Sequence, residues 1–90
     1  MGELRDDAAH RRLEMDVRGQ TVFANYRRDG QRLLIDHVEA PIGLRGSGAA
    51  GRFMEALTAH AWRERLTLTP ICSYAVHWLQ RHPEQAAGVV

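Results

Sequence analysis

The chain has 90 residues, of which 44% are hydrophobic and 26% charged, and its formal net charge is +1. These values suit one small soluble domain and argue against a nucleic-acid-binding protein, which normally presents a strongly basic face. No apolar run approaches the roughly 20 residues that span a bilayer, and the charged N-terminus lacks the apolar core of a signal peptide. The single cysteine excludes an internal disulfide. We therefore expect a cytoplasmic protein with no membrane partner.

The N-terminal part of the chain indicates a polar lead-in followed by a strand. Residues 1–10 are polar and acidic and are expected to fray, so the functional domain is predicted to span residues 11–90. Apolar and charged residues then alternate from Leu13 to Val17. This alternation is the period of a half-buried strand.

Two more strands are predicted before the middle of the chain. Residues 21–26 are β-branched and aromatic, which favours a strand. The pair Asp29-Gly30 is a hairpin signal, because both positions accept positive φ. A third strand follows over residues 32–39 and is ended by Pro41. The three strands are expected to form an antiparallel meander.

Helical periodicity dominates the second half of the chain. Apolar residues recur at helical spacing from Ala50 to Leu66, and a short β-branched run over residues 67–69 indicates a fourth strand. A short helix is predicted over residues 73–81, with Ser73 as its N-cap and His82-Pro83 as its end. The order β-β-β-α-β-α predicts an α/β (α+β) fold.

A glycine-rich loop, Arg45-Gly46-Ser47-Gly48-Ala49-Ala50-Gly51, joins the third strand to the long helix. Glycines let the backbone approach a ligand closely, and a helix N-terminus offers free N–H groups and a positive dipole end. Arg45 adds a planar donor fork. The loop therefore predicts a pyrophosphate site, although a tight strand-to-helix connection would need the same residues. It lacks the Gly-Lys-Ser/Thr ending of a P-loop and the later glycine of a dinucleotide-binding fold.

Cys72 follows the fourth strand and precedes a helix start. Such a cysteine is usually a small buried hydrophobe, but a thiol at a helix N-terminus is also more reactive than a free one. A metal cluster with His77 and His82 would combine one thiolate with two histidines on a short helix, which is a poor ligand set. We expect no metal.

His37 and Glu39 would share one face of a regular strand. They could be solvent-facing residues, or they could form a general-base or substrate-orienting pair near the strand's end. The two tryptophans, Trp62 and Trp78, are expected to be packing residues.

The glycine loop and three further ordered elements carry a family resemblance. Residues 45–50 match the Arg/Gln-x-x-Gly-x-Gly/Ala signature of GNAT-type N-acetyltransferases. The element His-Val-Glu-Ala-Pro precedes it at residues 37–41, Pro-Ile-Cys-Ser-Tyr follows the long helix at residues 70–74, and Arg-His-Pro-Glu stands at residues 81–84. In this order and spacing they resemble the small single-domain GNAT-like family often called YjdJ-type, over about residues 13–90.

The resemblance implies a minimal GNAT-like fold, a twisted and mainly antiparallel sheet with one long and one short helix. It also implies that acetyl-CoA lies in a wedge between the strand before the loop and the strand after the long helix. The residues that it assigns to coenzyme A are Val38, Glu39, Ala40, Arg45, Gly46, Ser47, Gly48, Ala49, Ala50, Gly51 and Tyr74. The elements expected from this sequence do not include the N-terminal helices that usually build the acceptor side of GNAT enzymes.

The resemblance leaves two routes of transfer open. In direct transfer an amine attacks the thioester, helped by Glu39 or His37 as base. In the covalent route Cys72 takes the acetyl group first and passes it on. The predicted catalytic residues are therefore Cys72, Glu39 and His37, and direct transfer is favoured because GNAT enzymes in general use it.

The predicted function is an acetyl-CoA-dependent N-acetyltransferase that acts on an amine of a protein or small molecule. The alternative is a CoA or acyl-CoA binding module without significant turnover, which would act through a partner. A homodimer is a candidate assembly, because a chain of 90 residues has only a small core.

Overall fold

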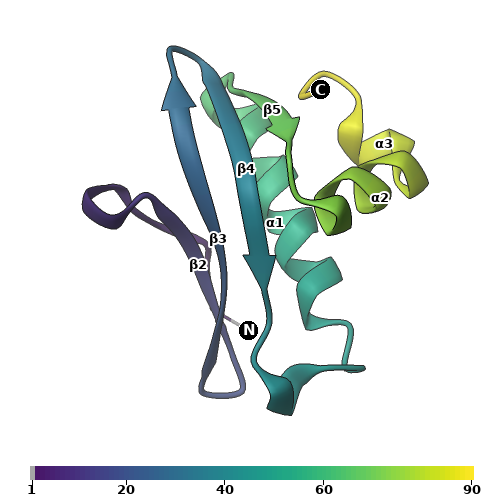
Figure 1. Ribbon diagram of the computed structural model, residues 1–90. Coiled ribbons are helices and arrows are strands. Elements are labelled where there is room, and N and C mark those ends of the chain that lie inside the picture. Colours follow the sequence, from purple (N-terminus) through teal and green to yellow (C-terminus); the bar gives the residue numbers. More distant parts are fainter. Residues whose placement is uncertain (1) are drawn as a thin grey trace.

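The computed structural model describes residues 2–90; Met1 lies outside them. One sheet contains five strands in the order β1-β2-β3-β4-β5. The strands are β1 (Arg5–Asp7), β2 (Arg12–Val17), β3 (Gln20–Asp29), β4 (Arg32–Glu39) and β5 (Thr67–Pro70). The helices are α1 (Ala49–Glu64), α2 (Ser73–Arg81) and α3 (Pro83–Ala86), with 3-10 turns η1 (Ala8–His10) and η2 (Ile42–Leu44). Helix α1 crosses behind the sheet, and α2 and α3 lie beside β5 (Figure 1). The predicted α+β class is confirmed, with β1 and α3 added to the predicted elements.

Strands β1 to β4 form an antiparallel meander, and β5 pairs with β4 in parallel. The β2–β3 turn places Arg18 and Gly19 at φ 53° and 74°, as in a type I′ turn. The β3–β4 turn lies one residue later than predicted, because Asp29 still pairs with Arg32 and Gly30 takes the first central position at φ 59°. Glycine at that position is typical of a type II′ turn.

The lead-in predicted to fray is ordered over its described part. The Gly2 N–H donates to the Asp16 carbonyl oxygen at 2.7 Å, and β1 pairs with β2. The Arg5 guanidinium also binds both oxygens of the Asp16 carboxylate, at 2.9 and 3.0 Å. The prediction of fraying from polar composition was wrong, because strand pairing and ion pairs can order a charged segment that has no apolar face.

Helix α1 supplies most of the helical side of the core. Its fully buried side chains include Phe53, Met54, Leu57 and Ala61, and they lie against the inner face of the sheet. The helix ends at Glu64, and its C-cap residue, Arg65, takes the left-handed conformation at φ 57°. The apolar period from Ala50 onward therefore identified both the helix and its buried face.

The structure corrects two expectations about the second half of the chain. The N-cap of α2 is Cys72, not Ser73, which is the first helical residue. Trp78 packs in the core as expected, but the Trp62 side chain is 65% exposed. Trp62 lies on the solvent side of α1 because the apolar stripe of that helix is already filled by smaller side chains.

A bulge in β4 decides which residues of that strand face the helices. The β3–β4 register shifts between Asn25 and Tyr26, which leaves Asp36 as the extra residue of β4. Before the bulge Leu33 and Ile35 are buried, whereas after it the partly buried positions are Val38 and Ala40. His37 and Glu39 consequently lie on the opposite, outer face of the sheet.

The free edge of β5 is closed to strand addition. The Thr67 and Ile71 N–H groups donate toward β4, so Leu68 and Pro70 face away from it. The Leu68 N–H donates to the Val89 carbonyl oxygen, and proline has no N–H to offer. Among residues 2–90, no helix is both long enough and apolar enough to cross a membrane.

Candidate functional site

Strands β4 and β5 separate at Ile35. The Ile35 carbonyl oxygen accepts hydrogen bonds from the N–H groups of Ile71, at 3.0 Å, and Cys72, at 3.2 Å. Strand β5 has ended there, while β4 continues to Glu39. Within residues 2–90, the edge of β4 that faces away from β3 has no strand partner beyond this point. Its backbone N–H and C=O groups are therefore available to another extended chain.

A cleft of about 270 Å³ lies at this opening. The end of β4, the glycine loop and the first turns of α1 and α2 form its walls. Its lining residues are His37, Val38, Glu39, Ala40, Arg45, Ala50 and Tyr74. Three segments that are far apart in the sequence thus meet at one cleft, and each contributes residues that the sequence singled out.

The glycine loop borders this cleft through its two ends, Arg45 and Ala50. Gly46 and Gly48 take the left-handed conformation, at φ 79° and 82°, and Gly48 is the N-cap of α1. The Ser47 hydroxyl oxygen accepts a hydrogen bond from the Ala49 N–H at 3.3 Å. The next two N–H groups, of Ala50 and Gly51, lie in the first helical turn and have no intrahelical acceptor. An anion would satisfy them.

The remaining loop residues divide between ligand-facing and packing positions. The Arg45 side chain is exposed and lines the cleft, whereas Ala49 is buried in the core. Arg52 steadies the loop, since its guanidinium donates to the Ser47 carbonyl oxygen at 3.2 Å. Gly51 lies inside α1, and a methyl group there would be 3.6 Å from the Trp78 indole nitrogen. That distance is an ordinary van der Waals contact, so α1 and α2 leave room for a methyl group at this position.

His37 and Glu39 form the pair predicted from their spacing. The His37 Nε2 and Glu39 Oε1 atoms are 3.0 Å apart, and both side chains are about half exposed. The Phe23 ring, which the sequence reasoning did not single out, meets the His37 ring edge-on at 6.4 Å between centroids. The Arg12 guanidinium lies 3.8 Å from the centre of the Phe23 ring. The alternation of buried and outward residues along β3 was a signal in the sequence that could have placed Phe23 on this outer face.

Glu39 is electrostatically distinct from its neighbours on the outer face. Asp36 is bound by Arg27 at 2.7 and 2.8 Å, which lowers the pKa of that carboxyl group. The hydrogen bonds from Arg5, and then from Thr21, likewise lower the pKa of Asp16. Glu39 instead has a histidine as its ion-pair partner. Its carboxylate therefore has one contact with an imidazole nitrogen, whereas Asp36 and Asp16 each contact two guanidinium nitrogens.

Cys72 lies beside the cleft without lining it. Its Sγ atom caps α2 by accepting a hydrogen bond from the Ala75 N–H at 3.4 Å. Tyr74, two residues later, does line the cleft. Burial raises the pKa of Tyr74, and the proximity of Cys72 adds to the rise.

The histidines near Cys72 have separate roles. His82 stacks on Trp78 at 3.9 Å between ring centroids, and its Nδ1 atom is 2.8 Å from the Trp78 carbonyl oxygen. His77 is exposed on α2. In the part of the chain that the structure describes, no three His, Cys, Asp or Glu residues are grouped to hold a metal ion.

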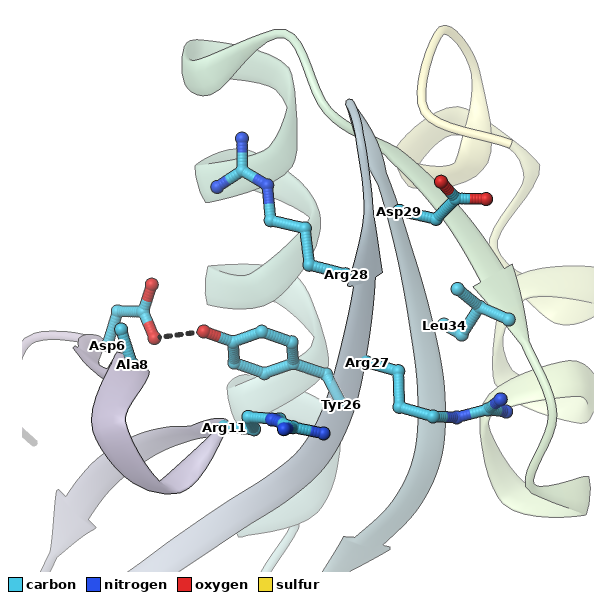
Figure 2. Close-up of a pocket in the computed structure, with 8 residues that line it drawn as sticks. All are labelled: Asp6, Ala8, Arg11, Tyr26, Arg27, Arg28, Asp29 and Leu34. Atoms are coloured by element: carbon cyan, nitrogen blue, oxygen red, sulfur yellow. Dashed lines mark hydrogen bonds between the residues drawn. The ribbon is translucent and has the colours of Figure 1, made fainter.

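A larger cavity of about 710 Å³ lies at the opposite end of β4, where Leu34 is among its lining residues. Figure 2 shows the Tyr26 ring between Arg28 and Arg11, with its hydroxyl group directed toward Asp6. That hydroxyl donates to the Asp6 carboxylate at 2.7 Å. Burial and this carboxylate raise the pKa of Tyr26 to about 12. The contact joins β1 to β3.

Comparison with known proteins identifies the family. The model of the GCN5-related N-acetyl-transferase family matches residues 12–89. The fold is shared with the NMR solution structure of a GCN5-like N-acetyltransferase candidate from Staphylococcus aureus, with a TM-score of 0.63 and 22% identity over 92% of this chain and 82% of that chain. A search of curated proteins finds no match. The chain belongs to the GCN5-related N-acetyltransferase (GNAT) family and is an acetyl-transferring enzyme.

Proposed function

We propose that the protein transfers the acetyl group of acetyl-CoA to an amine, and that the cleft between β4, the glycine loop and α2 is its donor site. The observation that carries this proposal is the meeting of an unpaired strand edge and free helix N–H groups at one cleft. An extended amide chain such as pantetheine can bind a strand edge as an added strand, and a pyrophosphate suits a helix N-terminus. GNAT enzymes generally use acetyl-CoA.

Three groups of residues would hold the donor. The backbone of residues 38–40 would pair with pantetheine, and the N–H groups of residues 46–51 would surround the pyrophosphate. Arg45 would offer two parallel N–H donors to phosphate oxygens. Tyr74 would form the wall of the cleft opposite β4.

Acetyl-CoA supplies an acyl carbon that its thioester activates toward attack by an amine. The His37–Glu39 pair would accept the proton that the amine loses, because one partner can take the proton while the other stabilises the charge that forms. The Tyr74 phenol, which like any tyrosine is protonated at neutral pH, would donate a proton from its hydroxyl group to the departing sulfur. Each of these side chains lines the cleft.

Direct transfer is favoured over an acetylated cysteine, because the Cys72 sulfur caps α2 and does not line the cleft. A Cys72→Ala variant should therefore keep wild-type turnover in an assay of CoA released from acetyl-CoA. Trapping of an acetyl group on Cys72 during turnover would instead support the covalent route.

The proposal is tested by calorimetric titration with CoA together with acetyl transfer to a panel of amines. Glu39→Gln should lower kcat by about 100-fold or more while the Kd for CoA stays within about two-fold. Glu64→Gln, an exposed change at the far end of α1, is the matched control and should leave both unchanged. Failure to bind CoA would overturn the proposal. Binding without transfer to any amine would favour the acyl-CoA binding module.

A further inference from the structure

The candidate donor cleft takes residues from both faces of β4. Two of them, Val38 and Ala40, are partly buried on the face toward the helices. Two others, His37 and Glu39, are exposed on the outer face. Among residues 2–90, no helix covers the outer face of β2 to β4, because α1 lies behind the sheet and α2 and α3 lie beside β5 (Figure 1). A donor held on the helix side would therefore meet an acceptor that enters from the outer face.

The outer face matches a single positive charge next to the cleft. Strands β2 and β4 carry four carboxylates on this face, those of Glu14, Asp16, Asp36 and Glu39. The first three contact the guanidinium group of Arg5 or Arg27, at distances between 2.7 and 3.2 Å. Within the described part of the chain, Glu39 pairs with His37 alone, and a histidine is charged only when it is protonated. The carboxylate that can bind a cation from solvent is therefore that of Glu39.

Apolar side chains stand on both sides of Glu39. Phe23 lies directly opposite Glu39 on β3 and is partly exposed. Across the cleft, Tyr74 is exposed and forms part of the wall, and the exposed Ile71 lies where β4 and β5 separate. An alkyl or aryl group that binds beside Glu39 would gain apolar contacts there.

Arg12 limits what can lie beyond Phe23. Its guanidinium is 3.8 Å from the centre of the Phe23 ring, and its Nε atom is 3.5 Å from a carboxylate oxygen of Glu14. Glu14 also contacts Arg5 at 3.2 Å, so it is already shared between two guanidinium groups. A second ammonium group on the acceptor would therefore approach Arg12 without a free counter-charge, and like charges that meet in this way are unfavourable.

We propose that the acceptor is a primary amine with one positive charge and an apolar body, bound on the outer face of β3 and β4, and that Phe23 and Arg12 determine this specificity. The assignment rests on the proposed function, because it needs acetyl-CoA in the cleft. The ammonium group binds Glu39 and the apolar body packs on Phe23.

The transfer step is balanced without a further reactant. The ammonium group first loses a proton to solvent. Its nitrogen then bonds to the acetyl carbon as the C–S bond breaks, and its next proton passes to the His37–Glu39 pair. The sulfur leaves as the thiol of CoA with the Tyr74 hydroxyl proton, which Tyr74 regains from solvent.

Two probes of equal length test the charge rule. Hexylamine and 1,6-diaminohexane share a six-carbon chain and differ in the number of ammonium groups. In the assay of CoA release, kcat/KM should be about ten-fold or more higher for hexylamine, although the diamine has two reactive nitrogens. Arg12→Gln should narrow this preference to about three-fold or less. A diamine that reacts as well as hexylamine with the wild type would overturn the assignment.

Chain length tests the apolar contact. Phe23→Ala should raise KM for hexylamine by about ten-fold with little change in kcat, because the lost contact is the same before and during the reaction. The effect on ethylamine should be much smaller, since its chain is too short to cover the ring. Leu34→Ala is the matched control, a partly exposed apolar residue on the same face near the other end of β4, and should leave KM unchanged. Equal losses for both amines in Phe23→Ala would contradict the contact.

Calorimetry with CoA separates this assignment from the proposed function. If CoA binds and diamines are the better acceptors, the acceptor assignment is wrong and the donor site stands. If CoA binds and no amine is acetylated, the acceptor assignment and the transfer reaction are both wrong. If CoA does not bind, the donor site falls as well.

Discussion

Replacement of Gly48 by alanine tests whether the glycine loop depends on backbone conformation. Gly48 is the N-cap of α1 at φ 82°, where an L side chain costs about 1–2 kcal/mol. The new Cβ atom would also lie 3.4 Å from an Arg52 guanidinium nitrogen, close to the bond from Arg52 to the Ser47 carbonyl oxygen. We expect Gly48→Ala to destabilise the protein by about 1–2 kcal/mol, because of the left-handed conformation.

Gly51→Ala is the matched control, three residues away in the same segment. Gly51 has no positive φ, and its Cβ atom would make an ordinary contact at 3.6 Å with the Trp78 indole nitrogen. Alanine inside a helix loses less conformational entropy on folding than glycine. We therefore expect Gly51→Ala to stabilise the protein by about 0.5–1 kcal/mol.

Urea unfolding followed by circular dichroism gives both free energies, and thermal unfolding gives a second measure. For a domain of this size a change of 1 kcal/mol shifts Tm by about 4–8 °C. The two variants should move in opposite directions. A Gly48→Ala variant as stable as the wild type, or a Gly51→Ala variant that is the less stable of the two, would contradict the conformational requirement at Gly48.

Three further outcomes follow from the structure. Tyr26→Phe removes the hydrogen bond to Asp6 and should cost about 1 kcal/mol in urea unfolding. Because the pKa of Tyr26 is about 12 when folded and near 10 when unfolded, its contribution should be complete below pH 10 and disappear as the pH rises through 12; Tyr26→Phe should flatten that decline. Phe53→Ala empties a fully buried site and should cost about 3–5 kcal/mol, measured in the same way, and a loss under 1 kcal/mol would contradict the packing of α1. Arg45→Ala should raise the Kd for CoA by about ten-fold in calorimetry without changing stability, since its side chain is exposed; an unchanged Kd would remove Arg45 from the donor site.

Local periodicity predicted most of the fold. The alternation around Met15 and the helical recurrence of Phe53 and Leu57 identified their elements because each repeats over several turns or strand positions. The β1 strand could not be predicted in this way. It has only three residues. It is held in part by the ion pair between Arg5 and Asp16, which are 11 residues apart in the sequence.

The shape of the candidate site depends on pairing that periodicity does not encode. Neither the bulge at Asp36 nor the separation of β4 from β5 at Ile35 leaves a local signal. The spacing of His37 and Glu39 did predict that they meet, since two residues apart on a strand share a face. The exposure of Trp62 could not be foreseen from composition, because an indole suits a core and an interface equally.

The proposed function requires that the cleft beside β4 binds acetyl-CoA. A titration of ¹⁵N-labelled protein with CoA, followed by NMR, tests it most directly. The largest shifts should occur at the backbone N–H groups of Gly46, Gly48, Ala50 and Gly51, together with those of residues 38–40. No shift at millimolar CoA, or shifts centred on the Tyr26 cavity instead, would contradict binding at this cleft.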